Sequence, residues 1–179
     1  MKINIEKIQK SLDELDRRFN DEVDKQEVDN FQLSIYCKAA ALELCGWLEE
    51  THDELIKEAL TENGLEESFI TEFDKKFISK IYGLSYDQHL RRLIINAFGF
   101  VNITKLESKI PQIDTLKSEL NNLHDYRNQL AHKQYLDFNN ENFVSAQQII
   151  DTPNKIKEKF NKIYPVLQEI VNYLNSNNL

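Results

Sequence analysis

Apolar side chains recur every three or four residues along most of the chain, which is the spacing of one face of an α-helix. The first such segment covers residues 4–23, where charged residues separate the apolar positions Ile5, Ile8, Leu12, Leu15 and Phe19. A polar stretch then leads to a longer helical segment, about 28–62, which the Asn63-Gly64 pair ends. Its middle, residues 33–48, is apolar nearly all round, so we expect this helix to pack on several sides.

Further helices are expected downstream. One carries Phe69, Phe73 and Phe77, which we expect in the core, and ends at Gly83. The others run from Ser85 to Gly99, over about 102–109, from Asp114 to about His132, and from Thr152-Pro153 through Pro165 to about Leu174. The pattern predicts an all-α fold, a helical bundle of five to seven helices in a single domain over residues 1–179. Its N-terminal helix should pack on the core, and residues 175–179 should fray.

Composition agrees with a helical domain. The 179 residues include only 4 glycines and 3 prolines, fewer than the turns of a sheet-rich chain need. Hydrophobic residues make up 41% of the chain, which is enough for a core. The formal net charge of −8 argues against general binding to DNA or to acidic membranes, but it leaves room for a small basic RNA site.

Two features predict a cytoplasmic protein without a membrane partner. No run approaches 18 apolar residues, and the N-terminus lacks the apolar core of a signal peptide. Cys37 and Cys45 lie eight residues apart on one expected helix, a separation of about 12 Å that a disulfide cannot span. We therefore expect two reduced, buried thiols.

Residues 114–135 hold the clearest candidate chemistry. An apolar stripe is formed there by Leu116, Leu120, Leu123 and Leu130, and Arg127 falls in the middle of it. Asn128 and His132 lie four residues apart beside Arg127, at the end of the expected helix. An imidazole that exchanges a proton and a guanidinium that holds phosphate oxygens together suit cleavage of a phosphodiester.

Other interpretations of this helix are open. Arg127 can be a structural arginine whose charge reaches solvent or an ion pair. His124, Asn128 and His132 share a helix face, which suggests a metal site. No third histidine or cysteine stands at ligand spacing, however, so we expect no metal and no cofactor.

The remaining histidines and a basic cluster are expected at the surface. His52 and His89 stand among charged residues. The basic cluster is expected to be a solvated face or, alternatively, to contact an RNA backbone, and it consists of Lys155, Lys157, Lys159 and Lys162. No glycine-rich phosphate loop, serine-centred elbow or CxxC pair is present.

The run Arg127-Asn128-Gln129-Leu130-Ala131-His132 resembles the motif of the HEPN superfamily, in which four to six residues separate an arginine from a histidine and asparagine commonly follows the arginine. The motif closes a late helix of an all-α domain, with one more long helix after it. The helical segment Ala39–Ile56 also resembles the corresponding family helix, which often carries an acid. Glu49 matches that acid best, with Glu43 and Glu50 as the other choices.

The resemblance implies a metal-independent endoribonuclease that acts as a toxin or an anti-phage defence effector. Two protomers would bring their motifs together in a homodimer, and an antitoxin or defence protein would be a further partner. Arg127 would bind the scissile phosphate, and His132 would act as general acid or base. Asn128 would orient the phosphate or the histidine, and Glu49 would hold Arg127. The candidates for further RNA contacts are Lys133, Tyr135 and His124.

The chain departs from one group of HEPN toxins, and a second function stays open. Toxins paired with small nucleotidyltransferase antitoxins usually have a tyrosine two residues after the histidine, whereas Gln134 stands there and Tyr135 follows. We therefore do not assign the chain to that group. The alternative function is a catalytically silent helical module that binds RNA, a nucleotide or a partner protein.

Two structural expectations accompany the proposed site. Glu49 and Arg127 should form a pair, because both fall within apolar stripes of their helices. The stripe around Glu49 contains Phe31, Ile35, Leu42, Cys45 and Ile56. The homodimer interface should include residues 123–135, where a partner could cover the site.

Overall fold

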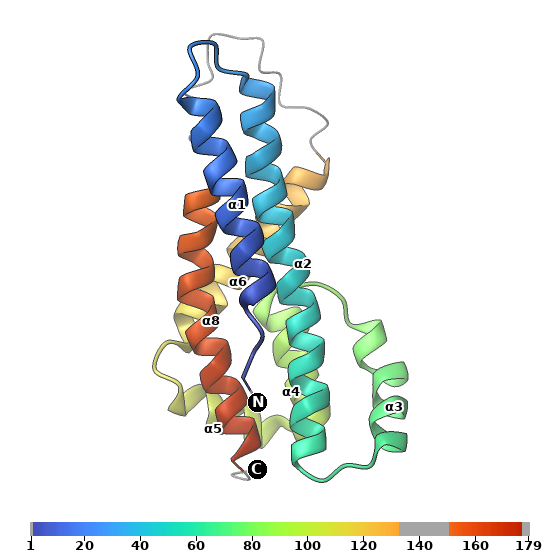
Figure 1. Cartoon of the computed structure of the whole chain (residues 1–179). Coiled ribbons are helices and arrows are strands. Elements are labelled where there is room, and N and C mark those ends of the chain that lie inside the picture. The colour runs from blue at the N-terminus through green and yellow to red at the C-terminus, as the bar shows by residue number, and fades with distance from the viewer. Residues whose placement is uncertain (1, 133–150, 177–179) are drawn as a thin grey trace. The chain divides into compact units, whose positions relative to one another are not determined.

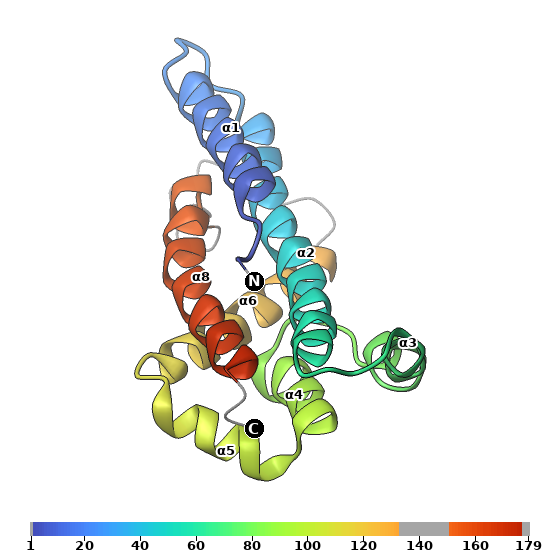
Figure 2. The same ribbon diagram turned by 60° about the horizontal axis from the view of Figure 1, so that its bottom comes forward.

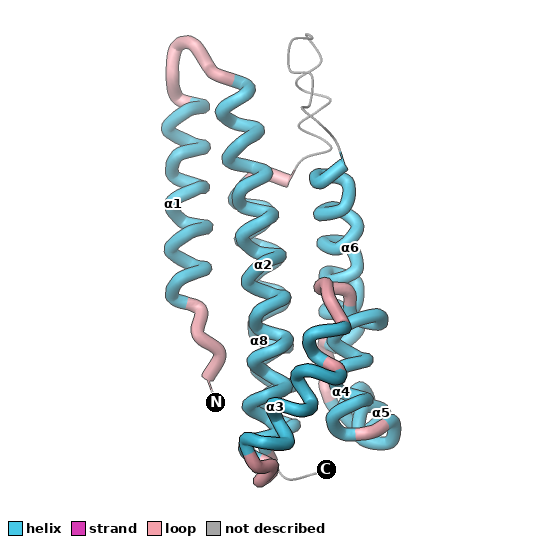
Figure 3. The backbone as a smooth tube through the Cα atoms, turned by 90° about the vertical axis from the view of Figure 1, so that its right-hand side faces the viewer, coloured by secondary structure: helices cyan, strands magenta, loops and turns pink. Residues whose placement is uncertain are grey.

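The computed structural model describes residues 2–132 and 151–176, and within them it contains α-helices and no strand (Figures 1 and 3). The seven α-helices of these residues are α1 (Glu6–Val23), α2 (Asn30–Glu62), α3 (Glu67–Lys76), α4 (Arg91–Phe98), α5 (Phe100–Lys109), α6 (Ile113–His132) and α8 (Pro153–Asn175). A short 3-10 helix, Ile78–Lys80, and a π-helical turn, Tyr86–Leu90, precede α4. The predicted all-α class with five to seven helices is confirmed.

The helix ends follow local capping chemistry. At the start of α2, the carboxylate of Asp29 accepts hydrogen bonds from the backbone N–H groups of Phe31, at 2.9 Å, and Gln32, at 3.1 Å. Gly64, with φ of 82°, follows the end of α2, and a left-handed conformation there favours glycine. Proline is the first residue of α8, as predicted, and the hydroxyl of Thr152 accepts the N–H of Lys155 at 3.4 Å.

The chain forms two compact units that interleave along the sequence. The first unit comprises Met1–Ile3, Leu48–His124 and Lys162–Leu179, and the second comprises Asn4–Trp47 and Asp125–Asn161. Helices α2, α6 and α8 each contribute residues to both units. The two units are described separately below.

The core of the first unit is built from short helices and the adjoining parts of long ones. Its α4 and α5 are joined at Gly99 and pack together (Figure 2). The fully buried side chains include Leu55, Ile56, Leu84, Tyr86, Leu90, Leu93, Ile94, Ile103 and Leu106. Removal of this apolar surface from water is the main stabilising contribution to the unit.

In the second unit, α1 lies alongside the first half of α2 (Figures 1 and 3). Phe19 of α1 packs there with Leu33 and Cys37 of α2 in one buried cluster. Trp47 contacts the ring of Phe160 edge to face, with 5.4 Å between the ring centroids. The cysteine prediction is confirmed, since both thiols are free and buried, and burial raises the pKa of Cys37 to about 12.

One prediction about packing is wrong, and another helix is less covered than its composition suggests. In α2, Phe31, Ile35 and Leu42 are 48%, 39% and 49% exposed, so part of its apolar surface faces solvent. In α3, Phe69 is 56% exposed, and Phe73 and Phe77 are only half-buried. In both helices the apolar spacing correctly predicts a helix. The neighbouring elements, however, cover a different face of the helix from the one that carries these exposed residues. None of the described helices combines the length and apolar character that a membrane span requires.

Candidate functional site

The candidate catalytic segment is the C-terminal part of α6. This helix continues through Arg127 and Asn128 to His132 without a break. Arg127 is half-buried and Asn128 is exposed, while Leu123, one turn before Arg127, is fully buried. The side chain of His132 and the whole of Lys133 and Tyr135 lie outside the described residues.

Tyr126 fixes this end of α6 within the second unit. Its ring packs against the cluster of Phe19, Leu33 and Cys37. Its hydroxyl accepts a hydrogen bond of 3.0 Å from the backbone N–H of Asp151, just before α8. Burial raises the pKa of the phenol, so Tyr126 stays neutral in the physiological range. Because Tyr126 holds one side of the helix, the adjoining Arg127 and Asn128 are directed to other sides of it.

We expect Tyr126→Phe to lower the free energy of unfolding by about 1–2 kcal/mol, because it leaves the partly buried N–H of Asp151 without its acceptor. Urea denaturation followed by circular dichroism measures the change. Tyr82→Phe is the matched control, because the side chain of Tyr82 is 73% exposed. Equal stability of the two variants would show that the tether contributes nothing.

The basic cluster of α8 is largely engaged in ion pairs. In the second unit, Lys157 lies 2.8 Å from Asp13 and 3.3 Å from Asp16 of α1. Lys159 of the same unit lies 3.5 Å from Asp151. In the first unit, Lys162 lies 3.1 Å from Glu119 of α6. These contacts neutralise much of the cluster, so its lysines present less free positive charge to an RNA backbone than the sequence alone suggests.

Glu49 lies on the part of α2 that belongs to the first unit, whereas Arg127 belongs to the second. Glu49 is half-buried, and the other two acids considered, Glu43 and Glu50, are exposed. Pairing of Glu49 with Arg127 stays a prediction. One turn after Glu49, burial raises the pKa of Asp53 to about 6, although Lys57 partly opposes that shift.

Three histidines gather in the first unit, and the sequence did not indicate this. His52 of α2 is 1% exposed, and neither of its ring nitrogens has a hydrogen-bond partner within the described residues. The rings of His89 and His124 lie 5.8 Å apart. The surface prediction for His52 and His89 is therefore wrong, since His52 is buried and His89 is half-buried. The useful signal was helical spacing, because His52 stands four residues after Leu48 and three before Leu55.

His89 is held by the turn that precedes α4. Its Nδ1 accepts the backbone N–H of Ser85 at 3.1 Å, so the Ser85 hydroxyl, 2.8 Å away, donates to the same nitrogen. A Cβ on Gly83 would come within 2.6 Å of the His89 ring, so only glycine fits beside it. No group of three histidine, cysteine, aspartate or glutamate residues in the described part of the chain is arranged to hold a metal ion.

Comparison with known proteins gives no family assignment. No protein-family model, no curated protein and no solved structure matches the chain. What the chain does is therefore inferred from its own residues.

Proposed function

We propose that the chain is a metal-independent endoribonuclease with its active site at the C-terminal end of α6. The observation that supports this most is the continuity of α6 through Arg127 to His132, with Arg127 half-buried beside an otherwise apolar stripe. The five-residue step corresponds to about 7.5 Å along a helix, a distance that a long arginine side chain can bridge to a phosphate near the imidazole.

The residues have separate roles in the proposed reaction. The RNA 2′-hydroxyl loses its proton and attacks the adjacent phosphorus, and the bond from phosphorus to the 5′-oxygen breaks. The 5′-oxygen takes up a proton, so the products carry a 2′,3′-cyclic phosphate and a 5′-hydroxyl. His132 acts as general acid or base in one of these transfers, and Arg127 stabilises the charge that builds on the phosphate oxygens. Asn128 orients the phosphate or the imidazole.

The same proposal includes the partners. A homodimer that covers residues 123–135 would bring two copies of the motif together. A toxin or defence effector of this kind also needs a protein that restrains it. Lys133 and Tyr135 are the proposed further contacts with RNA. His124 contacts the His89 ring in the first unit, which leaves it a weaker candidate for an RNA contact.

Incubation of the purified chain with structured and unstructured RNA in excess EDTA tests the proposal. We expect cleavage with cyclic-phosphate and 5′-hydroxyl ends, and a rate that changes between about pH 5 and 8, because histidine ordinarily titrates near 6.5. Loss of cleavage in EDTA with rescue by one divalent ion would contradict the mechanism. RNA binding without cleavage would instead support the silent module.

A further inference from the structure

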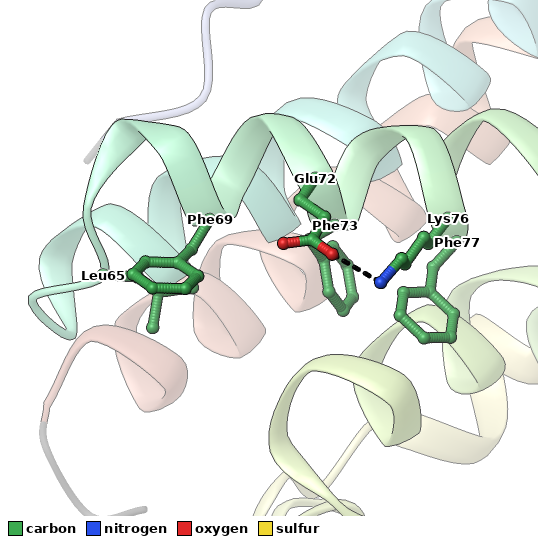
Figure 4. A pocket seen from close by; sticks show the side chains of 6 residues that line it. All are labelled: Leu65, Phe69, Glu72, Phe73, Lys76 and Phe77. Atoms are coloured by element: carbon green, nitrogen blue, oxygen red, sulfur yellow. Dashed lines mark hydrogen bonds and ion pairs between the residues drawn. The ribbon is translucent and has the colours of Figure 1, made fainter.

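The outward face of α3 forms an apolar groove in the first unit. Its walls are Leu65, Phe69, Phe73 and Phe77, and its volume is about 250 Å³. Figure 4 shows the aromatic rings on one side of the helix, with the ion pair of Glu72 and Lys76 beside them. Leu65 and Phe69 are 40% and 56% exposed, so this groove presents large apolar side chains to solvent.

The side of α3 next to the phenylalanine stripe anchors the helix, while Phe69 stays exposed and Phe73 and Phe77 are half-buried. Ile70 of α3 and Ile78 of the following 3-10 helix are buried. Asp74 forms an ion pair of 2.6 Å with Lys57 of α2. Phe69, Phe73 and Phe77 are spaced four residues apart and so form one stripe beside the buried Ile70. A contiguous exposed apolar stripe of this kind marks an interaction surface.

The charges along the groove change sign at its middle. Glu66 immediately precedes α3, and Glu72 lines the groove beside Phe73. Lys76 lines its other end, and Lys80 belongs to the 3-10 helix that follows. All four side chains are exposed. A helix with acids at one end and lysines at the other is complementary to a second copy of itself that runs in the opposite direction.

We propose that the α3 groove binds the α3 groove of a second copy of this chain, in an antiparallel contact about a two-fold axis at Phe73. Residues equally far on either side of Phe73 then face each other across the axis. Phe69 faces Phe77 of the second copy, and Glu66 faces Lys80 of the second copy. Glu72 comes within reach of Lys76 of the second copy, so the ion pair within each helix can be exchanged for one between helices.

The self-complementary charge pattern is the reason to choose a second copy, because an antiparallel copy carries the same order of charges and therefore places its lysines against the acids of the first. One short helix per copy gives an interface at the small end of the known range, so we expect dissociation in the micromolar range. The contact is independent of the proposed nuclease site, because α3 lies apart from residues 123–135 in the sequence and carries none of its residues.

A charge-exchange experiment on the full-length chain tests this contact. Glu66→Lys with Glu72→Lys makes the groove side of α3 positive, and Lys76→Glu with Lys80→Glu makes it negative. Each double variant alone should lose the concentration-dependent mass increase of the wild type in sedimentation equilibrium, measured across about 5–500 µM. An equimolar mixture of the two should recover it and reach about twice the mass of either alone.

Folding and specificity are controlled in the same experiment. All the substituted side chains are exposed, so the variants should keep the helical circular dichroism of the wild type. Glu67→Lys with Thr71→Lys adds positive charge to the opposite side of α3 and should leave the association unchanged. If the chain also forms a dimer through residues 123–135, each double variant keeps the mass of that dimer. Mixing the two variants should then still double the mass measured for either one alone. A wild-type mass that does not change with concentration, or double variants that associate as the wild type does, would overturn the proposal.

Discussion

His132→Ala should lower the rate of RNA cleavage by about 10²–10⁴-fold, the usual contribution of a positioned general acid or base. Alanine removes the imidazole and leaves α6 intact, since alanine is the best helix former. Single-turnover cleavage in EDTA measures the chemical step, and a binding assay with a non-cleavable RNA should show little change. A variant that keeps more than about a tenth of the wild-type rate would remove His132 from the reaction.

Arg127→Ala is the companion experiment, with an expected loss of about 10²–10³-fold if the guanidinium stabilises charge only in the transition state. Arg127→Lys should recover part of the rate, because lysine keeps the charge but not the two-pronged geometry. Gln129→Ala is the matched control, since Gln129 is exposed on the same helix between the two candidates. Arg127 is half-buried, so unfolding of each variant is followed in parallel. The double variant should lose little more than His132→Ala alone, because residues that act together are not additive.

Helix boundaries could be predicted where they depend on local chemistry, but not in α3, which ends at Lys76 and not at Gly83 as predicted. Helix α1 begins and ends within two residues of the predicted segment, and α2 ends before Asn63-Gly64 as expected. Thr152 and Pro153 likewise mark the start of α8. Capping side chains, glycine and proline act over three or four residues, so they can be identified without any tertiary information.

The buried face of a helix could not always be predicted, because it depends on which element lies beside it. The spacing of Phe69, Phe73 and Phe77 predicts a helix, and α3 is one. Ile70 and Ile78, however, are the side chains that the rest of the first unit buries. A short helix with apolar residues on two sides offers no local signal that distinguishes its core from its exposed side.

Helical spacing also predicts part of the candidate site, namely how far Arg127 is buried, but it does not predict contacts between residues far apart in the sequence. The position of Arg127 within an apolar stripe predicts a partly buried guanidinium, and its side chain is half-buried in the structure. The tether at Tyr126 was not predicted, because the N–H of Asp151 lies 25 residues away along the chain. The burial of His52 was not predicted either. The charged residues beside it in the sequence lie on the exposed side of α2, whereas His52 lies on the buried side.

Acid should destabilise the first unit at a pH where most carboxylates are still ionised. Burial, with a further contribution from His89, lowers the pKa of His52 to about 3, against about 6.5 in an unfolded chain. Between these values the unfolded state binds more protons, so the free energy of unfolding rises with pH and falls as pH drops below 6.5. The loss should be on the order of 2 kcal/mol by pH 4.5. Urea denaturation at a series of pH values measures it.

Two substitutions separate His52 from the other titrating groups. His52→Leu should flatten the dependence on pH between about 6.5 and 4, and it should stabilise the protein near pH 7 because it removes two buried nitrogens that have no hydrogen-bond partner within the described residues. Asp53 has the opposite effect on the pH dependence of the free energy of unfolding. Its pKa is raised to about 6, so the folded state binds more protons there and stability from this group falls as pH rises between about 4 and 6.

Asp53→Asn should therefore make the acid destabilisation steeper, while His52→Leu makes it shallower. Ionised carboxylates such as Glu107, whose pKa Arg91 and Tyr86 hold below its usual value by hydrogen bonds, lose their stabilising contribution only at lower pH. Their titration therefore lies below the interval from about pH 6.5 to 5, in which His52 and Asp53 act. If His52→Leu and the wild type had the same slope in that interval, His52 would have to be protonated in the folded protein, and its burial without hydrogen-bond partners would be wrong.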